Sequence, residues 1–172
     1  MADLQIRLAR LRVPLGFCAA AVAAGCARPN ATSLLYGMIV ACAGEAIRVW
    51  AAGHLEKGRE VTRSGPYRFS RHPLYVGSTV MACGIAVATA SVWVAGVAAL
   101  YLATTLTAAI RTEEAFLRRQ FGDQYDDYCR GKGAVADRPF SWARAWRNRE
   151  WRAIVGLGVA GLLLAAKAAW LH

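Results

Sequence analysis

Apolar residues in this chain are gathered into long runs that are separated by shorter polar stretches. Five runs are visible, and they cover Val13–Ala27, Ser33–Ala52, Leu74–Ala90, Val92–Ile110 and Ala153–Leu171. A helix needs about 20 mostly apolar residues to cross the hydrocarbon core of a bilayer. The pattern therefore predicts an all-α, polytopic integral membrane protein with about five transmembrane helices, built as one domain over residues 1–172. The first run is short, and the second contains Glu45 and Arg48.

Cationic residues lie mainly in the polar stretches between these runs. The sequence has 172 residues, with 21 Lys and Arg against 11 Asp and Glu. Most of the cations form three blocks, which precede the first run, separate the second from the third and separate the fourth from the fifth. With five spans, all three blocks share one side of the membrane, which the positive-inside rule makes cytoplasmic. This topology accounts for the basic charge, and without a nucleic-acid-binding motif we expect no nucleic acid as a partner.

The likeness of the first run to a targeting signal affects this topology. Three arginines precede the run, and Ala23–Cys26 lies near its end, as in a secretory or lipoprotein signal. Leucine is absent three residues before Cys26, and the distribution of cations fits five spans. We therefore expect the run to be retained, with a cytoplasmic N-terminus. High alanine and arginine usage favours a bacterial source and hence the inner membrane.

The spacing of the cysteines predicts no metal site. The chain has five cysteines, and none of them forms a CxxC pair. An odd count without such pairs favours neither a disulfide framework nor a zinc site. Free cysteines in apolar surroundings behave as small hydrophobic residues.

Two polar segments follow the fourth run. Thr112–Arg130 is predicted to be a helix that continues out of the membrane and loosens at Gly131–Gly133. Arg138–Arg152 mixes arginines with aromatic side chains, a composition that is typical of an interfacial helix lying against anionic headgroups.

The start of the third run carries the first candidate chemistry. Proline is favoured at the first position of a helix, so Pro73 is predicted to begin the span with His72 as its N-cap. The N–H groups of Leu74 and Tyr75 would then lie free at the positive end of the helix dipole. An anionic ligand group is stabilised in such a place.

The flanking residues fit the same interpretation. Arg71 and His72 add hydrogen-bond donors, and Gly77, one turn into the helix, leaves room for a ligand or another backbone to approach. The alternative is that Arg71 and His72 only extend toward the membrane interface, as many residues that flank membrane helices do.

Acidic residues carry the second candidate chemistry. Glu113 and Glu114 follow the fourth run, and Glu114 can pair with Arg118 one turn later. Adjacent residues on a helix point about 100° apart, so one acid can face a ligand while the other is held by arginine or water. Glu45 and Arg48 are spaced to touch on one helical face, as a functional site within the membrane or as a structural ion pair.

Taken together, these stretches resemble a known family. GPYRFSRHPLYVG, from Gly65 to Gly77, and EEAFLRRQFGDQYDDYCR, from Glu113 to Arg130, are similar to the signature of the isoprenylcysteine carboxyl methyltransferase family. Its relatives include bacterial membrane methyltransferases and the phospholipid N-methyltransferases. The resemblance extends roughly over residues 44–138, and the final span at 153–171 lies beyond it.

The resemblance implies a methyl transfer that depends on S-adenosylmethionine. The acceptor would be a lipophilic molecule or lipid with a carboxylate, thiol or amine group, and it would enter laterally from the bilayer. The residues implied to bind the cofactor are Tyr67, Arg71, His72, Pro73, Leu74, Tyr75, Gly77, Glu113 and Glu114. Those implied in catalysis are Glu113, with either Glu113 or Glu114 as a possible base, and Arg130 and Arg138, as candidates to orient an acceptor carboxylate.

Two other classes of protein compete with this interpretation. A membrane reductase of the sterol-reductase type has a related helical architecture and would use NADPH. It would need a site for a larger polyphosphate, and only one basic motif of the right kind is visible. In a non-catalytic membrane scaffold, the same motifs would serve only to cap helices.

Overall fold

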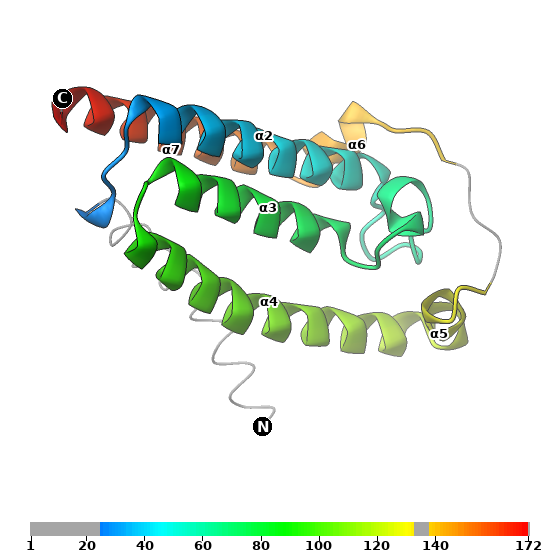
Figure 1. Ribbon diagram of the computed structural model, residues 1–172. Helices are drawn as coiled ribbons and strands as arrows, with labels where there is room; N and C mark the ends of the chain where they lie inside the picture. The colour runs from blue at the N-terminus through cyan, green and yellow to red at the C-terminus, as the bar shows by residue number, and fades with distance from the viewer. Residues whose placement is uncertain (1–24, 133–137, 172) are drawn as a thin grey trace.

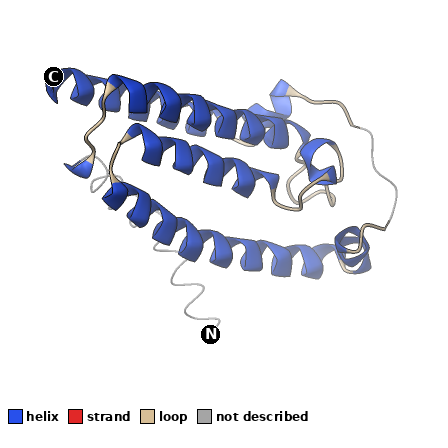
Figure 2. Cartoon of the chain, in the orientation of Figure 1, coloured by secondary structure: helices blue, strands red, loops and turns tan. Residues whose placement is uncertain are grey.

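The computed structural model describes residues 25–132 and 138–171, and within these ranges the chain forms helices and no strand (Figures 1 and 2). The all-α fold class is therefore confirmed. The helices are α2 (Ala31–His54), the short 3-10 helix η1 (Gly65–Arg68), α3 (Pro73–Ala88), α4 (Val92–Phe121), α5 (Asp123–Cys129), α6 (Trp142–Arg147) and α7 (Trp151–Leu171).

The long helices form an antiparallel bundle in which sequence neighbours pack together (Figure 1). α3 packs along α2, α4 follows α3 after a tight turn, and α7 packs against α2. The end of α2, the start of α3, the end of α4 and the start of α7 consequently lie at one end of the bundle, together with η1, α5 and α6 (Figure 1). We call this end the loop end.

Among the described residues, three helices are long and apolar enough to cross a membrane, namely α2, α4 and α7. α3 has 16 residues, which at 1.5 Å per residue is about 24 Å, less than the roughly 30 Å of a hydrocarbon core. The predicted span at Val13–Ala27 lies almost entirely outside the described residues. The structure thus supports an integral membrane protein without confirming the count of about five spans.

Capping residues fix where the helices begin. Asn30 accepts a hydrogen bond from the Ser33 N–H at 2.9 Å, and Ser33 accepts one from the Asn30 N–H at 3.1 Å, a capping box at the start of α2. His72 is the N-cap of α3 and Pro73 its first residue, as predicted.

The predicted helix over Thr112–Arg130 is wrong at one point, because the chain turns at Gly122. This residue has φ +49°, a conformation that glycine adopts without the steric cost of a Cβ, and it separates α4 from α5. As a result, α5 lies across the end of α4 instead of extending it (Figure 1).

Glycines bring the backbones of α2 and α3 into contact. A Cβ built on Gly44 would lie 2.7 Å from the Gly77 carbonyl oxygen, and one built on Gly84 would lie 2.6 Å from the Gly37 carbonyl oxygen. Small residues of this kind allow close helix packing in membranes. The sequence predicted that Gly77 leaves room either for a ligand or for another backbone. The structure shows the second of these, because the backbone of α2 approaches Gly77.

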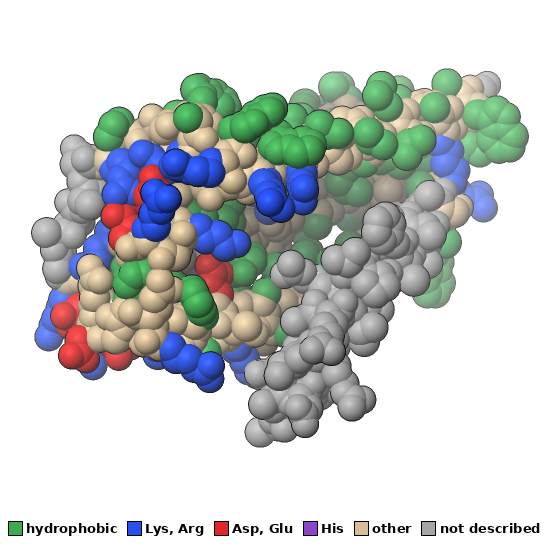
Figure 3. All heavy atoms as spheres, turned by 180° about the vertical axis from the view of Figure 1, so that it is seen from behind, with side chains coloured by type: hydrophobic (Ala, Val, Ile, Leu, Met, Phe, Trp, Pro, Cys, Tyr) green, Lys and Arg blue, Asp and Glu red, His purple; other side chains and the backbone are tan. Residues whose placement is uncertain are grey.

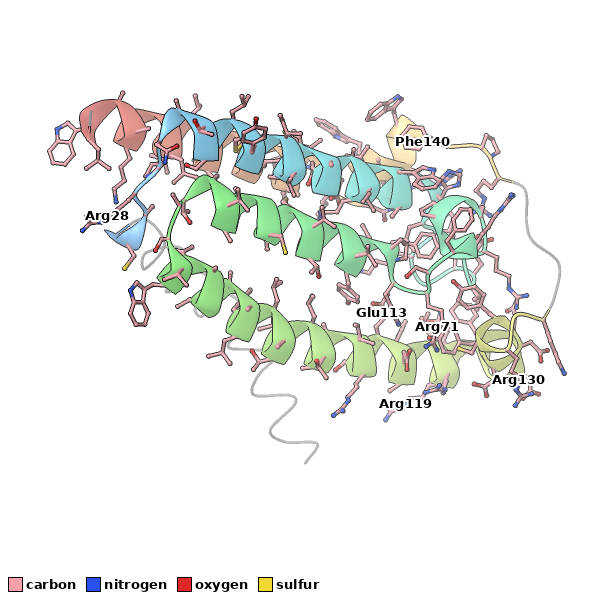
Figure 4. The ribbon with its side chains drawn as sticks, viewed as in Figure 1. Arg28, Arg71, Glu113, Arg119, Arg130 and Phe140 are labelled. Carbon is pink, nitrogen blue, oxygen red and sulfur yellow. The ribbon has the colours of Figure 1, made fainter. Side chains whose placement is uncertain are left out.

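The outer surface of the bundle is apolar, and its charges gather at the loop end. Large side chains such as Leu100, Leu162 and Trp170 are more than half exposed on α4 and α7. Figure 3 shows Lys and Arg side chains concentrated at one end, with hydrophobic side chains over much of the rest of that face. Arg28 lies at the opposite end of the bundle (Figure 4). This distribution suits helices in contact with lipid.

Candidate active site at the loop end of the bundle

A cavity of about 780 Å³ lies at the loop end between α3 and α4. This volume is within the range of small-molecule sites in proteins, about 300–1,000 Å³. The loop after α2, α5 and the residues before α7 also contribute to its walls. The charged side chains among the lining residues are Arg48, Glu56, Lys57, Glu60, Arg71, Glu113 and Glu150.

Glu114 on α4 connects this helix to the start of α3. Its Oε1 atom lies 3.2 Å from His72 Nε2 and 3.4 Å from Arg71 Nη1. Its Oε2 atom lies 3.8 Å from Arg118 Nη1, the pair that the spacing predicted. The two motifs are far apart in the sequence, and this one carboxylate joins them.

Glu113 has the other orientation. It lines the cavity, whereas Glu114 is held by basic side chains. Figure 4 shows Glu113 and Arg71 on the side of α4 that faces the start of α3. The two acids thus point in different directions, as expected from helix geometry: one faces the cavity and the other is held by arginine.

A buried phenol, Tyr67, and a half-buried one, Tyr128, support the wall formed by η1. The Tyr128 hydroxyl donates to the Tyr67 carbonyl oxygen at 2.8 Å, which ties α5 to η1. Burial raises the pKa of Tyr128 to about 12, and burial together with the charge of Glu113 raises the pKa of Tyr67 well above its usual range. Both side chains are therefore neutral hydroxyl groups near neutral pH.

The start of α3 offers fewer free donors than the sequence predicted. The Tyr75 N–H, expected to be free, donates to the His72 carbonyl oxygen at 3.0 Å, because the first turn of α3 tightens there. In the part of the chain that the structure describes, the Leu74 N–H has no such acceptor. Arg71 and His72 both line the cavity beside it.

The structure brings most of the predicted site residues to the cavity. Its lining includes Tyr67, Arg71, His72, Pro73, Leu74, Tyr75 and Glu113, with Glu114 directly behind them. Gly77 instead packs against α2.

The two arginines proposed for acceptor orientation lie elsewhere. Arg138 Nη1 pairs with Glu60 Oε1 at 2.6 Å, and Arg130 is mostly exposed, 4.0 Å from Asp127. Neither is among the lining residues, so their catalytic role stays a prediction without support from the cavity.

Sequence reasoning missed a charged cluster on the opposite wall. Arg48 of α2 lines the cavity, and its Nε atom lies 2.7 Å from Oε1 of Glu150, a residue just before α7. The predicted pairing with Glu45 is present at 3.5 Å. The spacing of Glu45 and Arg48 in the sequence predicted their contact. The contact between Arg48 and Glu150 was not predicted, because it depends on how α7 packs against α2.

The loop that follows α2 covers the cavity and is clamped from outside. Its residues from Leu55 to Thr62 contribute to the lining. Arg144 of α6 donates to Glu56 at 2.9 Å and to the Gly53 carbonyl oxygen at 2.5 Å. The interfacial segment around α6 therefore holds one edge of the cavity in place.

Comparison with known proteins identifies the family. The fold and cavity define an integral membrane protein with a cavity, lined in part by charged side chains, at one end of a helical bundle. The family model described as "Phospholipid methyltransferase" matches residues 32–124, more than half of the chain. The chain belongs to this family of membrane methyltransferases, and the resemblance seen in its motifs is confirmed.

Two relatives carry names from metal resistance. The chain is 36% identical over 103 residues to the nickel-cobalt-cadmium resistance protein NccN of Alcaligenes xylosoxydans xylosoxydans, which covers 59% of this chain and 48% of that protein. It is 35% identical over 99 residues to the cobalt-zinc-cadmium resistance protein CzcN of Cupriavidus metallidurans, covering 56% and 45%. The chain thus spans about half the length of these curated relatives.

Two further observations complete the comparison. No solved structure matches the chain. Within residues 25–132 and 138–171, no group of three or more His, Cys, Asp or Glu side chains is arranged to hold a metal ion.

Proposed function

We propose that this protein transfers a methyl group from S-adenosylmethionine to a lipophilic acceptor in the membrane. One observation carries the proposal: the contact of Glu114 with His72 and Arg71 makes the two motifs a single unit at one cavity. A basic helix start and an acidic segment of α4 then face a space large enough for a nucleoside-sized ligand.

The chemistry of the lining fits this methyl donor, which has a carboxylate, an amino group and ribose hydroxyls. Arg71 and the Leu74 N–H would bind the carboxylate, at a helix start where negative charge is stabilised. Glu113 would accept hydrogen bonds from the amino group or the ribose, since ionised acceptors make the stronger hydrogen bonds. The neutral Tyr67 hydroxyl adds a polar group to the same lining.

An apolar wall supports a lipophilic acceptor. On α4 the lining continues toward the membrane interior through Leu102, Leu106 and Ala109. Side chains of this kind offer no hydrogen bonds and suit a hydrocarbon chain. An acceptor that lies between α3 and α4 would place its polar head at the donor while its apolar part stays in lipid.

When bound, S-adenosylmethionine supplies a methyl group on a positively charged sulfur, and transfer to an acceptor lone pair leaves the bonding electrons on sulfur. The residues of this chain contribute mainly by orientation, which can lower a barrier substantially. His72 and Glu114 fix the two walls relative to each other. Glu113 is the carboxylate at which a proton from the acceptor would be received.

The loop end would face the cytoplasm. It carries most of the basic residues, which favours the cytoplasmic side of a bacterial inner membrane, and it contains both motifs. A soluble donor would then have access from the cytoplasm.

Isothermal titration of the purified protein in detergent tests the proposal. S-adenosylhomocysteine should bind and NADPH should not. His72→Ala and Glu114→Gln should each lower the affinity about 10–100-fold, the effect expected for the loss of a charge-assisted hydrogen bond. Asp127→Asn, an exposed carboxylate outside the cavity, is the matched control and should bind normally. Binding of NADPH, or unchanged affinity in both site variants, would contradict the proposal.

A further inference from the structure

The short helix α6 presents an aromatic face away from the rest of the protein. Trp142 and Trp146 lie one turn apart on this helix and are 70% and 68% exposed, whereas Ala145, on the opposite side, is 4% exposed. α6 packs against α2 and comes just before the start of α7, and both of these helices are long and apolar enough to cross a membrane (Figure 1). The exposed tryptophans therefore lie at the membrane boundary, where tryptophan is enriched.

Two arginines beside this face have no anionic partner. Arg149 and Arg152 are exposed, and in the described part of the chain no carboxylate pairs with either of them. Glu150, between them in the sequence, is buried and pairs with Arg48 on the inner side. The guanidinium carbon of Arg152 lies 5.5 Å from the centroid of the Trp151 ring, so cations and aromatic rings share this surface. Such a surface is complementary to anionic phospholipid head groups.

The backbone at Arg149 is one that favours glycine. Arg149 has φ +62°, and its N–H donates to the Trp146 carbonyl oxygen at 2.8 Å, which closes the end of α6. Glycine is the usual residue at such a helix end, because any side chain there costs stability. Strained residues of this kind cluster at functional sites. The exposed guanidinium is what arginine adds at this position.

The opposite face of α6 holds the loop that covers the cavity, residues 55–62, which we call the covering loop. Asn148, the C-cap of α6, donates to the Leu55 carbonyl oxygen at 2.9 Å, and Arg144 donates to the Glu56 carboxylate at 2.9 Å. Leu55 and Glu56 themselves line the cavity. A shift of α6 would therefore move the base of the covering loop.

The tip of the covering loop has little support of its own. Lys57, Gly58 and Arg59 are exposed, and Gln120 of α4 donates to the Gly58 carbonyl oxygen at 2.7 Å. A segment with few buried apolar contacts opens at a low cost in free energy. The attachment to α6 therefore determines how firmly the covering loop lies over the cavity.

We propose that anionic phospholipid head groups bind the exposed face of α6 and the first turn of α7, and thereby hold the covering loop over the cavity. Arg149 and Arg152 pair with lipid phosphates, while Trp142 and Trp146 lie between the head groups and the acyl chains. Lipid binding favours the position of α6 in which Asn148 reaches the loop. The shift cannot exceed the difference in lipid affinity between the two positions of α6. Each cation near an anionic surface contributes about a fivefold preference.

Hydrogen–deuterium exchange in lipid nanodiscs tests this coupling without any ligand. The Leu55 N–H donates to the Ala51 carbonyl oxygen and the Glu56 N–H to Thr62 Oγ1, so both amides report on the loop. In phosphatidylglycerol, the wild type should exchange these amides about fivefold or more slowly than in phosphatidylcholine. The variant with Arg149→Gly and Arg152→Gln should lose most of this difference.

A charge-matched control excludes a general effect of basic residues. Arg119→Gln with Lys132→Gln removes the same number of charges from exposed side chains near α5 and should keep the lipid effect. Figure 4 shows Arg119 on the outer side of α4, away from α6. Because Arg149→Gly relieves the backbone at φ +62°, the α6 variant should melt in neutral detergent at or above the wild-type temperature. Its lost lipid response would then not reflect unfolding.

Quenching by brominated lipid identifies what covers the aromatic face. Phosphatidylglycerol with brominated acyl chains should quench part of the tryptophan fluorescence, and Trp142→Phe with Trp146→Phe should lower the quenched signal. An unchanged quenched signal would mean that another protein surface or water covers this face, and it would overturn the proposal.

The outcomes separate this inference from the proposed function. Equal loop exchange in the two lipids, or equal slowing in the α6 variant and its control, would overturn the coupling, while binding of S-adenosylhomocysteine would still support a methyltransferase. The consequence for the donor rests on the proposed function: S-adenosylhomocysteine should bind about fivefold more tightly in phosphatidylglycerol, and equal affinity would contradict a part for the loop in donor binding. If it binds in neither lipid, the proposed function fails, and the exchange comparison still decides the lipid effect.

Discussion

Replacing Gly44 with alanine would test how closely α2 and α3 pack beneath the cavity. The added Cβ would lie 2.7 Å from the Gly77 carbonyl oxygen and 2.8 Å from the Met81 Cα. The Met81 backbone nitrogen would lie closer still, and because the shortest ordinary contact is 3.4 Å, α3 must retreat by roughly 1 Å. All three obstacles are backbone atoms, and none can rotate away as a side chain could.

The change in the free energy of unfolding caused by Gly44→Ala follows from two opposing effects. Overpacking of this kind costs about 1–3 kcal/mol. Alanine in place of a helical glycine regains up to about 1 kcal/mol of helix propensity. We expect Gly44→Ala to destabilise the protein by about 1–2 kcal/mol. Movement of α3 should also lengthen the 3.2 Å contact between His72 and Glu114 and weaken the binding of S-adenosylhomocysteine.

The assay is thermal unfolding in detergent, followed by titration with S-adenosylhomocysteine. Gly96→Ala on α4 and Gly156→Ala on α7 are matched controls, because a Cβ at either position meets no atom within 4 Å. The controls should melt at or slightly above the wild-type temperature, and Gly44→Ala several degrees below it. Equal melting temperatures for Gly44→Ala and the controls would refute the close packing.

Three other predictions concern single features of the loop end. Gly122→Ala should cost about 1–3 kcal/mol of stability in thermal unfolding, because φ +49° strains any side chain even where space is open. Tyr128→Phe should cost about 1 kcal/mol in the same assay through the lost bond to the Tyr67 carbonyl, with wild-type stability as the contrary result. A membrane-impermeant maleimide should label Cys129 only from the cytoplasmic side and Cys26 only from the other side, and the reverse pattern would contradict the topology.

The course of the helices could be predicted because the bilayer and the capping residues act locally. The apolar runs anticipated α2 and α7 to within two residues at each end, since a spanning helix has a length set by the membrane. The fourth run gave the start of α4, which continues beyond Ile110 to Phe121. The start of α3 followed from the position of Pro73. The turn at Gly122 was missed because a lone glycine within a helical pattern does not specify that the chain turns there.

The site was predicted in part. A common membrane face for the motifs followed from topology, and the contact of Glu114 with His72 agrees with it. The pairing of Arg48 with Glu150 could not be predicted, because it depends on the packing of α7 against α2. The bonding of the Tyr75 N–H is likewise a detail of the first turn of α3 that the sequence pattern does not specify.

The transfer of a labelled methyl group tests the central claim most directly. Membranes that contain the wild-type protein, the His72→Ala variant or the Asp127→Asn control would be incubated with S-adenosylmethionine labelled in its methyl group, and the lipid extract analysed by mass spectrometry. We expect label in a lipid-soluble product with the wild type and the control, and none with His72→Ala. Equal label in all three, or none above membranes that lack the protein, would contradict a methyltransferase site at this cavity.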